Sequence, residues 1–241
     1  MGVLNTDQDT AATEVATRMA DAASAWLTAL KPDQRAVVTR PAPGAGTESE
    51  AERQRWFYTP TDHGGLALGA QTPAQQRLAH QLVASGLSAA GYVTVATIIG
   101  LENVLDHAEG WVANWERERG RDPELYYLRV FGEPGGPEPW GWRFGGHHIS
   151  LNYTVIEGRV TSCTPSFIGA HPATTGLIAD GTLAPLGHLE STARQLALSL
   201  TRASCSAAEL VVRKRRNSNS ARPCGNWLRI APTSRVTSLK Y

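Results

Sequence analysis

The residues of this chain best suited to chemistry are arginine and histidine in the segment WGWRFGGHHISLN. Arg143 lies shortly before His148, and Ser150 and Asn152 follow at alternate positions. An imidazole titrates near neutral pH, and a guanidinium binds a carboxylate or a phosphate through paired hydrogen bonds. Arg143 would hold an anionic group, His148 would act as a base or metal ligand, and Ser150 or Asn152 would orient the substrate. We take these residues as the candidate catalytic group.

A divalent metal is the cofactor that the sequence leaves open. Its ligand candidates are His148 together with His171 or His63, because imidazole nitrogen is a common ligand of zinc and similar ions. The cysteines show no C-x-x-C spacing, which argues against a structural zinc site and against a disulfide framework. The chain has no G-x-S-x-G motif and no phosphate-binding loop motif, so spacing singles out no nucleophile.

A β-hairpin is predicted to position the candidate residues. Gly145-Gly146 is a two-residue turn candidate, because glycine accepts positive φ without a Cβ penalty. A turn there sets Arg143 opposite His148 on a polar face that Ser150 and Asn152 continue, while His147 points to the apolar face. Since neighbouring strand residues point to opposite faces, His147 and His148 are not expected to bind one metal.

The hairpin belongs to a predicted antiparallel meander of at least four strands, apolar on one face and polar on the other. Residues 126–131 form a further strand, and a turn at Glu157-Gly158 pairs Val155 with Val160 and Tyr153 with Ser162. The following residues of the apolar face are predicted to be buried: Trp140, Trp142, Ile149, Leu151 and Val155.

Helices are predicted before the sheet, which makes the fold class α+β, with N-terminal helices packed on one face of the meander. Residues 10–30 and 91–109 carry apolar positions at helical spacing. A helix starts at Thr72-Pro73, where Gln75 completes a capping box. Glu102 and Asp106 are expected on a solvated helix face.

The run PWGWRFGGHH at residues 139–148 resembles the family catalogued as domain of unknown function 3500. Further segments carry the same resemblance: residues 56–58 (WFY), 66–69 (LALG), 72–75 (TPAQ), 121–127 (RDPELYY), 150–152 (SLN), 164–165 (TP) and 167–170 (FIGA). The resemblance covers roughly residues 12 to 200. Because that family has no assigned function, the resemblance implies a common fold and supplies no chemistry.

Charge divides the chain near residue 200. Residues 201–241 hold nine of the 23 Lys and Arg residues but only one of the 22 acids, Glu209. We predict a single α+β domain over residues 1–200 and a basic, poorly ordered tail over residues 201–241. The resemblance implies that a second half commonly follows here, so a truncated or frameshifted family member is favoured over a divergent tail.

Two classes of function follow from these residues. One is an enzyme, or a metal-dependent enzyme, acting on a small anionic substrate at the Arg/His face. The alternative is a non-enzymatic module that binds a small ligand or a peptide, or an inactive truncated family member. Nucleic acid is not an expected partner, because the basic run 213–216 lacks interleaved aromatic residues. The chain shows neither a signal-peptide pattern nor an apolar run of membrane-spanning length, so a cytoplasmic protein without membrane contact is expected.

Overall fold

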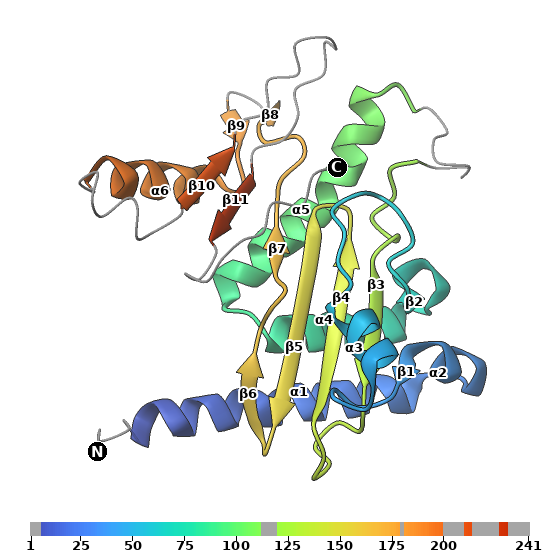
Figure 1. Ribbon diagram of the computed structural model, residues 1–241. Coiled ribbons are helices and arrows are strands. Elements are labelled where there is room, and N and C mark those ends of the chain that lie inside the picture. Colours follow the sequence, from blue (N-terminus) through green and yellow to red (C-terminus); the bar gives the residue numbers. More distant parts are fainter. Residues whose placement is uncertain (1–5, 112–119, 179–180, 200–209, 214–226, 231–241) are drawn as a thin grey trace. The chain divides into compact units, whose positions relative to one another are not determined.

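The computed structural model describes residues 6–111, 120–178, 181–199, 210–213 and 227–230 (Figure 1). It divides into two compact units, Met1–Phe167 and Ile168–Tyr241. The second unit contains the paired strands β8 (Thr175–Ile178) and β9 (Gly181–Leu183), the helix α6 (Gly187–Ser199), and the paired strands β10 (Leu210–Arg213) and β11 (Trp227–Ile230). Most of the predicted tail lies outside the described residues, so its disorder stays a prediction. No helix of the described part is both long and apolar enough to cross a membrane.

The first unit is built on a seven-stranded sheet. Its main path runs in the order β1 (Thr39–Arg40), β3 (Tyr127–Phe131), β4 (Trp140–Gly146), β5 (Ile149–Ile156) and β6 (Arg159–Ser162). Two short strands join it: β2 (Leu66–Ala67) beside β3, and β7 (Phe167–Ile168) beside β5. Neighbours from β3 to β6 are antiparallel and only β1 runs parallel to β3, so the predicted meander is confirmed.

Helices cover both faces of this sheet. Behind it in Figure 1 lie α1 (Thr6–Ala29), α4 (Pro73–Ser85) and α5 (Ala89–Ala108). In front lies α3 (Thr47–Gln54), and α2 (Pro32–Val38) stands at the β1 edge. The capping box predicted at the start of α4 is present, with Thr72 accepting from the backbone of Gln75. The α+β class with N-terminal helices packed on the sheet is confirmed.

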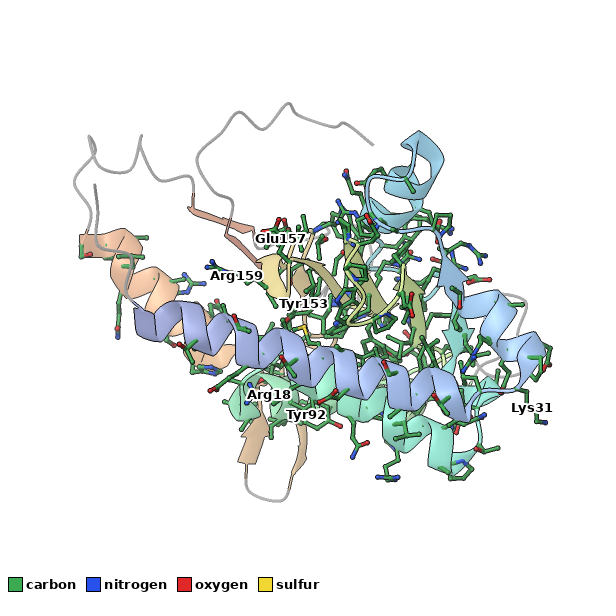
Figure 2. All side chains as sticks on the ribbon, turned by 90° about the horizontal axis from the view of Figure 1, so that it is seen from below. Arg18, Lys31, Tyr92, Tyr153, Glu157 and Arg159 are labelled. Carbon is green, nitrogen blue, oxygen red and sulfur yellow. The ribbon has the colours of Figure 1, made fainter. Side chains whose placement is uncertain are left out.

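The apolar face of the sheet forms the main core. The residues predicted to be buried there are all 2% exposed or less: Trp140, Trp142, Ile149, Leu151 and Val155. The ring of Trp142 stacks on Tyr153 at a centroid distance of 4.5 Å, and the hydroxyl of Tyr153 donates to the carbonyl oxygen of Gly86 at the end of α4. Figure 2 shows side chains filling the space between these helices and the sheet, with Tyr153 labelled among them.

The turn of the central hairpin is displaced from its predicted place. Gly146 pairs with Ile149, so the turn residues are His147 and His148, and Arg143 lies opposite Asn152. The predicted pairing of Arg143 with His148 was therefore wrong. The displacement moves the turn by an even number of residues along the strand, and for this reason the sorting of strand residues into an apolar and a polar face survives.

Close packing explains why Gly145 and Gly146 lie in a strand. A Cβ on Gly146 would collide with the ring of Tyr126, and one on Gly145 would come within 2.8 Å of the His63 ring. Neither glycine has positive φ, whereas His148 has a φ of 62°. The glycines are needed for the approach of aromatic rings, and the residues after them make the turn.

The second hairpin follows the prediction in part. Its turn lies at Glu157-Gly158, both with positive φ as a type I′ turn requires, and Val155 pairs with Val160 as predicted. The register then shifts, so that Ser162 lies opposite Thr154 instead of Tyr153. A β-bulge at this point adds one residue to one strand, which sequence alternation does not reveal.

A histidine cluster at the tip of the central hairpin

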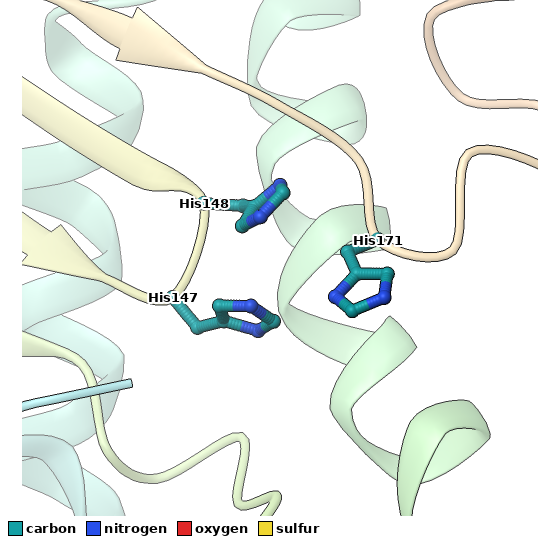
Figure 3. A group of neighbouring side chains, drawn as sticks. All are labelled: His147, His148 and His171. Carbon is teal, nitrogen blue, oxygen red and sulfur yellow. The ribbon is translucent and has the colours of Figure 1, made fainter. Parts of the chain in front are cut away.

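His147 and His148 form the tip of the β4–β5 hairpin. Because they lie in the turn, their rings point the same way and their centroids are 4.5 Å apart (Figure 3). The expectation that neighbouring histidines could not share one metal was therefore wrong, since it assumed an ordinary strand. The backbone N–H of His148 donates to the carbonyl oxygen of Tyr58 at 3.1 Å. This bond fixes the turn against residues 52–63, which cover the polar face of the sheet and are called the covering segment below.

His171 is the third histidine of the cluster. It follows three residues after the end of β7, a strand that is hydrogen-bonded to β5. Each of His147, His148 and His171 offers one ring nitrogen, and these atoms lie within 4.8 Å of one another (Figure 3). Two of the predicted metal-ligand candidates, His148 and His171, are thus brought together, and His147 joins them.

Helix α5 supplies an acid to this cluster. Nδ1 of His147 lies 2.5 Å from Oε1 of Glu102, and the Glu102 side chain is buried at 2% exposed. Asp106, one turn further along α5, is 5% exposed. The prediction that Glu102 and Asp106 lie on a solvated helix face was therefore wrong. Sequence spacing shows that acids share one face of a helix, but it does not show whether that face meets water or a buried polar cluster.

The contact with Glu102 determines how His147 can act. If Nδ1 carries the hydrogen and donates it to the carboxylate, the lone pair of His147 is at Nε2, which is the usual arrangement of a metal-binding histidine. Burial lowers the pKa of His147 to about 3, and the charge of Arg121 acts in the same direction. The imidazole is therefore neutral at neutral pH, as metal binding requires.

His63, the remaining metal-ligand candidate, lies apart from this group. Its Nε2 is 2.9 Å from the carbonyl oxygen of Thr59, and its ring stacks on Tyr127 at 6.1 Å. Burial lowers the pKa of His63, so this side chain is also neutral. Its contacts are those of a residue that packs a loop onto the sheet.

Arg143 is buried (3% exposed) against α3 and the segment that follows it, where it contacts Glu52, Arg55 and His63. Its guanidinium donates to Oε1 of Glu52 at 2.9 Å, to the carbonyl oxygen of His63 at 2.6 Å, and to the carbonyl oxygens of Glu52 and Arg55. Burial raises the pKa of Glu52, but Arg143 and Arg129 outweigh it and lower that pKa. The guanidinium of Arg143 is therefore paired with Glu52 and hydrogen-bonded to main-chain oxygens inside the protein.

The other two candidate catalytic residues share this environment. Ser150 and Asn152 are both 1% exposed, and the amide of Asn152 donates to the carbonyl oxygen of Arg53. The structure does not bring them or Arg143 to a common surface with His148. Their catalytic roles stay predictions, while Arg143 and Asn152 hold the covering segment on the sheet through carbonyl oxygens.

An open groove lies near the cluster, and aromatic rings lie between the two. The sequence did not predict this groove. Tyr58 and Phe167 lie 6.3 and 6.1 Å from the ring of His148, and Trp56 lies 5.6 Å from Phe167. A groove of about 450 Å³ begins at Trp56 and is lined by Arg53, Gln54, Trp56, Ser162, Thr164 and Pro165. The aromatic run at residues 56–58, which is partly exposed, was the available indication.

A protein-family model described as "Protein of unknown function (DUF3500)" matches residues 12–229. The chain belongs to this family. The DUF3500 match takes in the hairpin, all three histidines of the cluster and the groove, and it continues past residue 200 into β11. Neither the comparison with curated proteins nor the comparison with solved structures finds a match.

Proposed function

We propose that this DUF3500 protein is a metal-dependent enzyme whose metal ion is held by His147, His148 and His171. The observation that carries the proposal is the convergence of three imidazole rings at the hairpin tip. Histidine is the commonest metal ligand among side chains.

The ligand set favours zinc. Nitrogen ligands suit Zn²⁺ and its neighbours, whereas magnesium and calcium prefer oxygen. Three protein ligands leave a fourth tetrahedral position for water or substrate, which distinguishes catalytic zinc sites from closed structural ones. A bound zinc ion would lower the pKa of such a water and supply hydroxide for hydrolysis.

Two residues would orient the proposed metal ligand His147. Glu102 accepts from His147 and would hold its ring so that Nε2 points to the metal. Tyr126 donates from its hydroxyl to the carbonyl oxygen of His147 at 2.7 Å, which fixes the backbone at the same residue. Both would act by positioning His147.

The proposal takes no anion-binding group from Arg143, since Glu52 and main-chain oxygens occupy its donors. The proposal therefore retains the prediction of a metal-dependent enzyme and drops the prediction that its substrate is anionic.

Elemental analysis of the purified full chain tests the proposal. Protein prepared with zinc in the medium should contain about one zinc ion per chain, and His148→Ala and His171→Ala should each lose it. His63→Ala is the matched control, because this buried histidine lies outside the cluster, and it should keep the metal. Protein that binds no divalent ion at micromolar concentration, or a His148→Ala variant that binds it as well as the parent, would refute the metal site.

A test for chemistry follows on the loaded protein. Hydrolysis of ester, amide or glycoside test substrates should depend on the metal and disappear in His148→Ala. Metal binding without any hydrolysis across these substrates would favour the non-enzymatic alternative.

A further inference from the structure

The groove beside the histidine cluster combines a partly exposed aromatic ring with polar side chains. Trp56 is 38% exposed, whereas Trp26, Trp140 and Trp142 of the core are each 2% exposed or less. An aromatic ring left partly open in a groove offers a flat apolar surface for stacking. The lining also includes the hydroxyls of Ser162 and Thr164, whose oxygens lie 3.0 Å apart.

The charge in this groove is neutralised within the protein. Arg53 donates to both carboxylate oxygens of Glu50 and to the hydroxyl of Thr154 at 3.0 Å. Hydrogen bonding by Arg53 lowers the pKa of Glu50 to about 2, so the pair carries opposite charges at neutral pH. The groove thus presents hydrogen-bonding groups without excess charge, which favours a neutral ligand over an anion.

From these contacts we infer that the groove binds a neutral sugar ring, stacked on Trp56 with its hydroxyls toward Ser162, Thr164 and Gln54. A pyranose has the required amphipathic form, because its C–H groups make an apolar face and its hydroxyls form a rim of donors and acceptors. The volume of about 450 Å³ accommodates one or two such rings.

Aromatic rings connect Trp56 in the groove to the histidine cluster. The aromatic contacts run from Trp56 to Phe167 and from Phe167 to His148, all within the first unit. Trp56 is thus separated from the proposed metal ligand His148 by the single ring of Phe167. This inference rests on the proposed function for its chemistry and names the substrate class, a neutral oligosaccharide or glycoside.

Calorimetric titration of the full chain with maltose, cellobiose and lactose tests the inference. At least one of these disaccharides should bind saturably in the millimolar range. Trp56→Ala should weaken that binding by about tenfold or more, since truncating a stacked aromatic at the centre of a site is typically costly. Trp56→Phe should retain part of the affinity, and Thr164→Val should weaken binding while keeping the side-chain volume.

Two controls distinguish binding in the groove from binding at other aromatic side chains or at the metal. Trp111→Ala removes an exposed tryptophan (65% exposed) that contacts His107 and does not line the groove, and it should leave sugar binding unchanged. Sugar binding should also persist after the chain is stripped with EDTA, and the zinc content of Trp56→Ala should equal that of the parent.

The inference fails if no disaccharide binds, if Trp56→Ala binds as tightly as the parent, or if binding disappears with the metal. None of these results bears on metal content, so failure of the sugar site and failure of the metal site are separable.

Discussion

Glu52 holds the guanidinium of Arg143 inside the protein, with Oε1 of the acid 2.9 Å from the arginine nitrogen. The arginine side chain is 3% exposed and the glutamate 21%, so this pair lies mostly away from water. Arg143→Ala should destabilise the fold by about 3 kcal/mol or more, because the carbonyl oxygens of Glu52, Arg55 and His63 lose their buried donor, and each unpaired buried acceptor costs about 1–3 kcal/mol. Urea unfolding measures the difference in the free energy of unfolding.

Arg55→Ala is the matched control for that change. Arg55 pairs with the same glutamate at 3.5 Å, but its side chain is 41% exposed. Exposed pairs contribute about 0–1 kcal/mol, so this variant should unfold close to the parent. Equal costs for the two variants would contradict a buried structural role for Arg143.

His148→Gly should separate stability from function. A φ of 62° costs a residue with a Cβ about 1 kcal/mol, and glycine adopts it freely. We expect the variant to melt at or above the temperature of the metal-free parent and to lose metal binding. His147→Ala should instead lose stability, because it takes away the partner at Nδ1 from the buried Glu102. A clear drop in melting temperature for His148→Gly would show that its ring contacts outweigh the strain.

Glu102→Gln should weaken zinc binding by about 10–100-fold, the usual effect of changing the group that orients a ligating histidine. The amide keeps the volume of the carboxylate but loses its charge and acceptor strength. A competition titration with a zinc chelator measures the change. The exposed Glu124→Gln serves as control, and affinity that is equal in both variants would exclude a positioning role for Glu102.

Gly146→Ala should destabilise the hairpin by about 1–3 kcal/mol, because its Cβ would collide with the buried ring of Tyr126. Gly100→Ala makes the same chemical change on the exposed side of α5, where a Cβ meets no atom within 4 Å. That variant should stabilise the protein by about 0.5–1 kcal/mol through higher helix propensity. Thermal unfolding with opposite signs for the two variants is the expected result.

Tyr153 links stability to alkaline pH. Burial raises the pKa of its phenol to about 12, with a further contribution from Cys163. A folded-state pKa above the unfolded value of 10.0 means that the folded state holds the proton more tightly. This stabilisation is complete below pH 10 and is lost as the pH rises from there through about 12.

Tyr153→Phe removes the titrating group. It should cost about 0.5–1.5 kcal/mol at neutral pH, through the hydrogen bond to Gly86. Its free energy of unfolding should fall less than that of the parent between pH 10 and 12. Parallel pH profiles for the two proteins would contradict the raised pKa.

The sequence predicted the sorting of the central strands into two faces, because alternation of Trp140, Trp142 and Phe144 with glycine and arginine is a local property. It did not predict the turn. Gly145-Gly146 fits a tight turn by local chemistry, and only the rings of Tyr126 and His63, brought in from other segments, require those glycines in a strand. Such a tertiary requirement leaves no trace in the hairpin itself.

The candidate site was predicted only in part, again because tertiary contacts leave no trace in the local sequence. His148 and His171 were candidates by residue type, whereas His147 was excluded by the assumed register. The burial of Arg143 depends on α3 and the residues after it, which cover a face that alternation alone describes as polar and open to water. Glu102 became part of the site because α5 turns its acids inward.

The sheet holds that covering segment largely by its main chain. Side chains of Arg143 and Asn152 donate to carbonyl oxygens of Glu52, Arg53, Arg55 and His63. A carbonyl oxygen is the same in every amino acid, so most side chains of the segment can change without loosening its attachment. The groove residues Gln54 and Trp56 lie on this segment. Point substitutions there can therefore reshape the groove while the scaffold beneath stays constant.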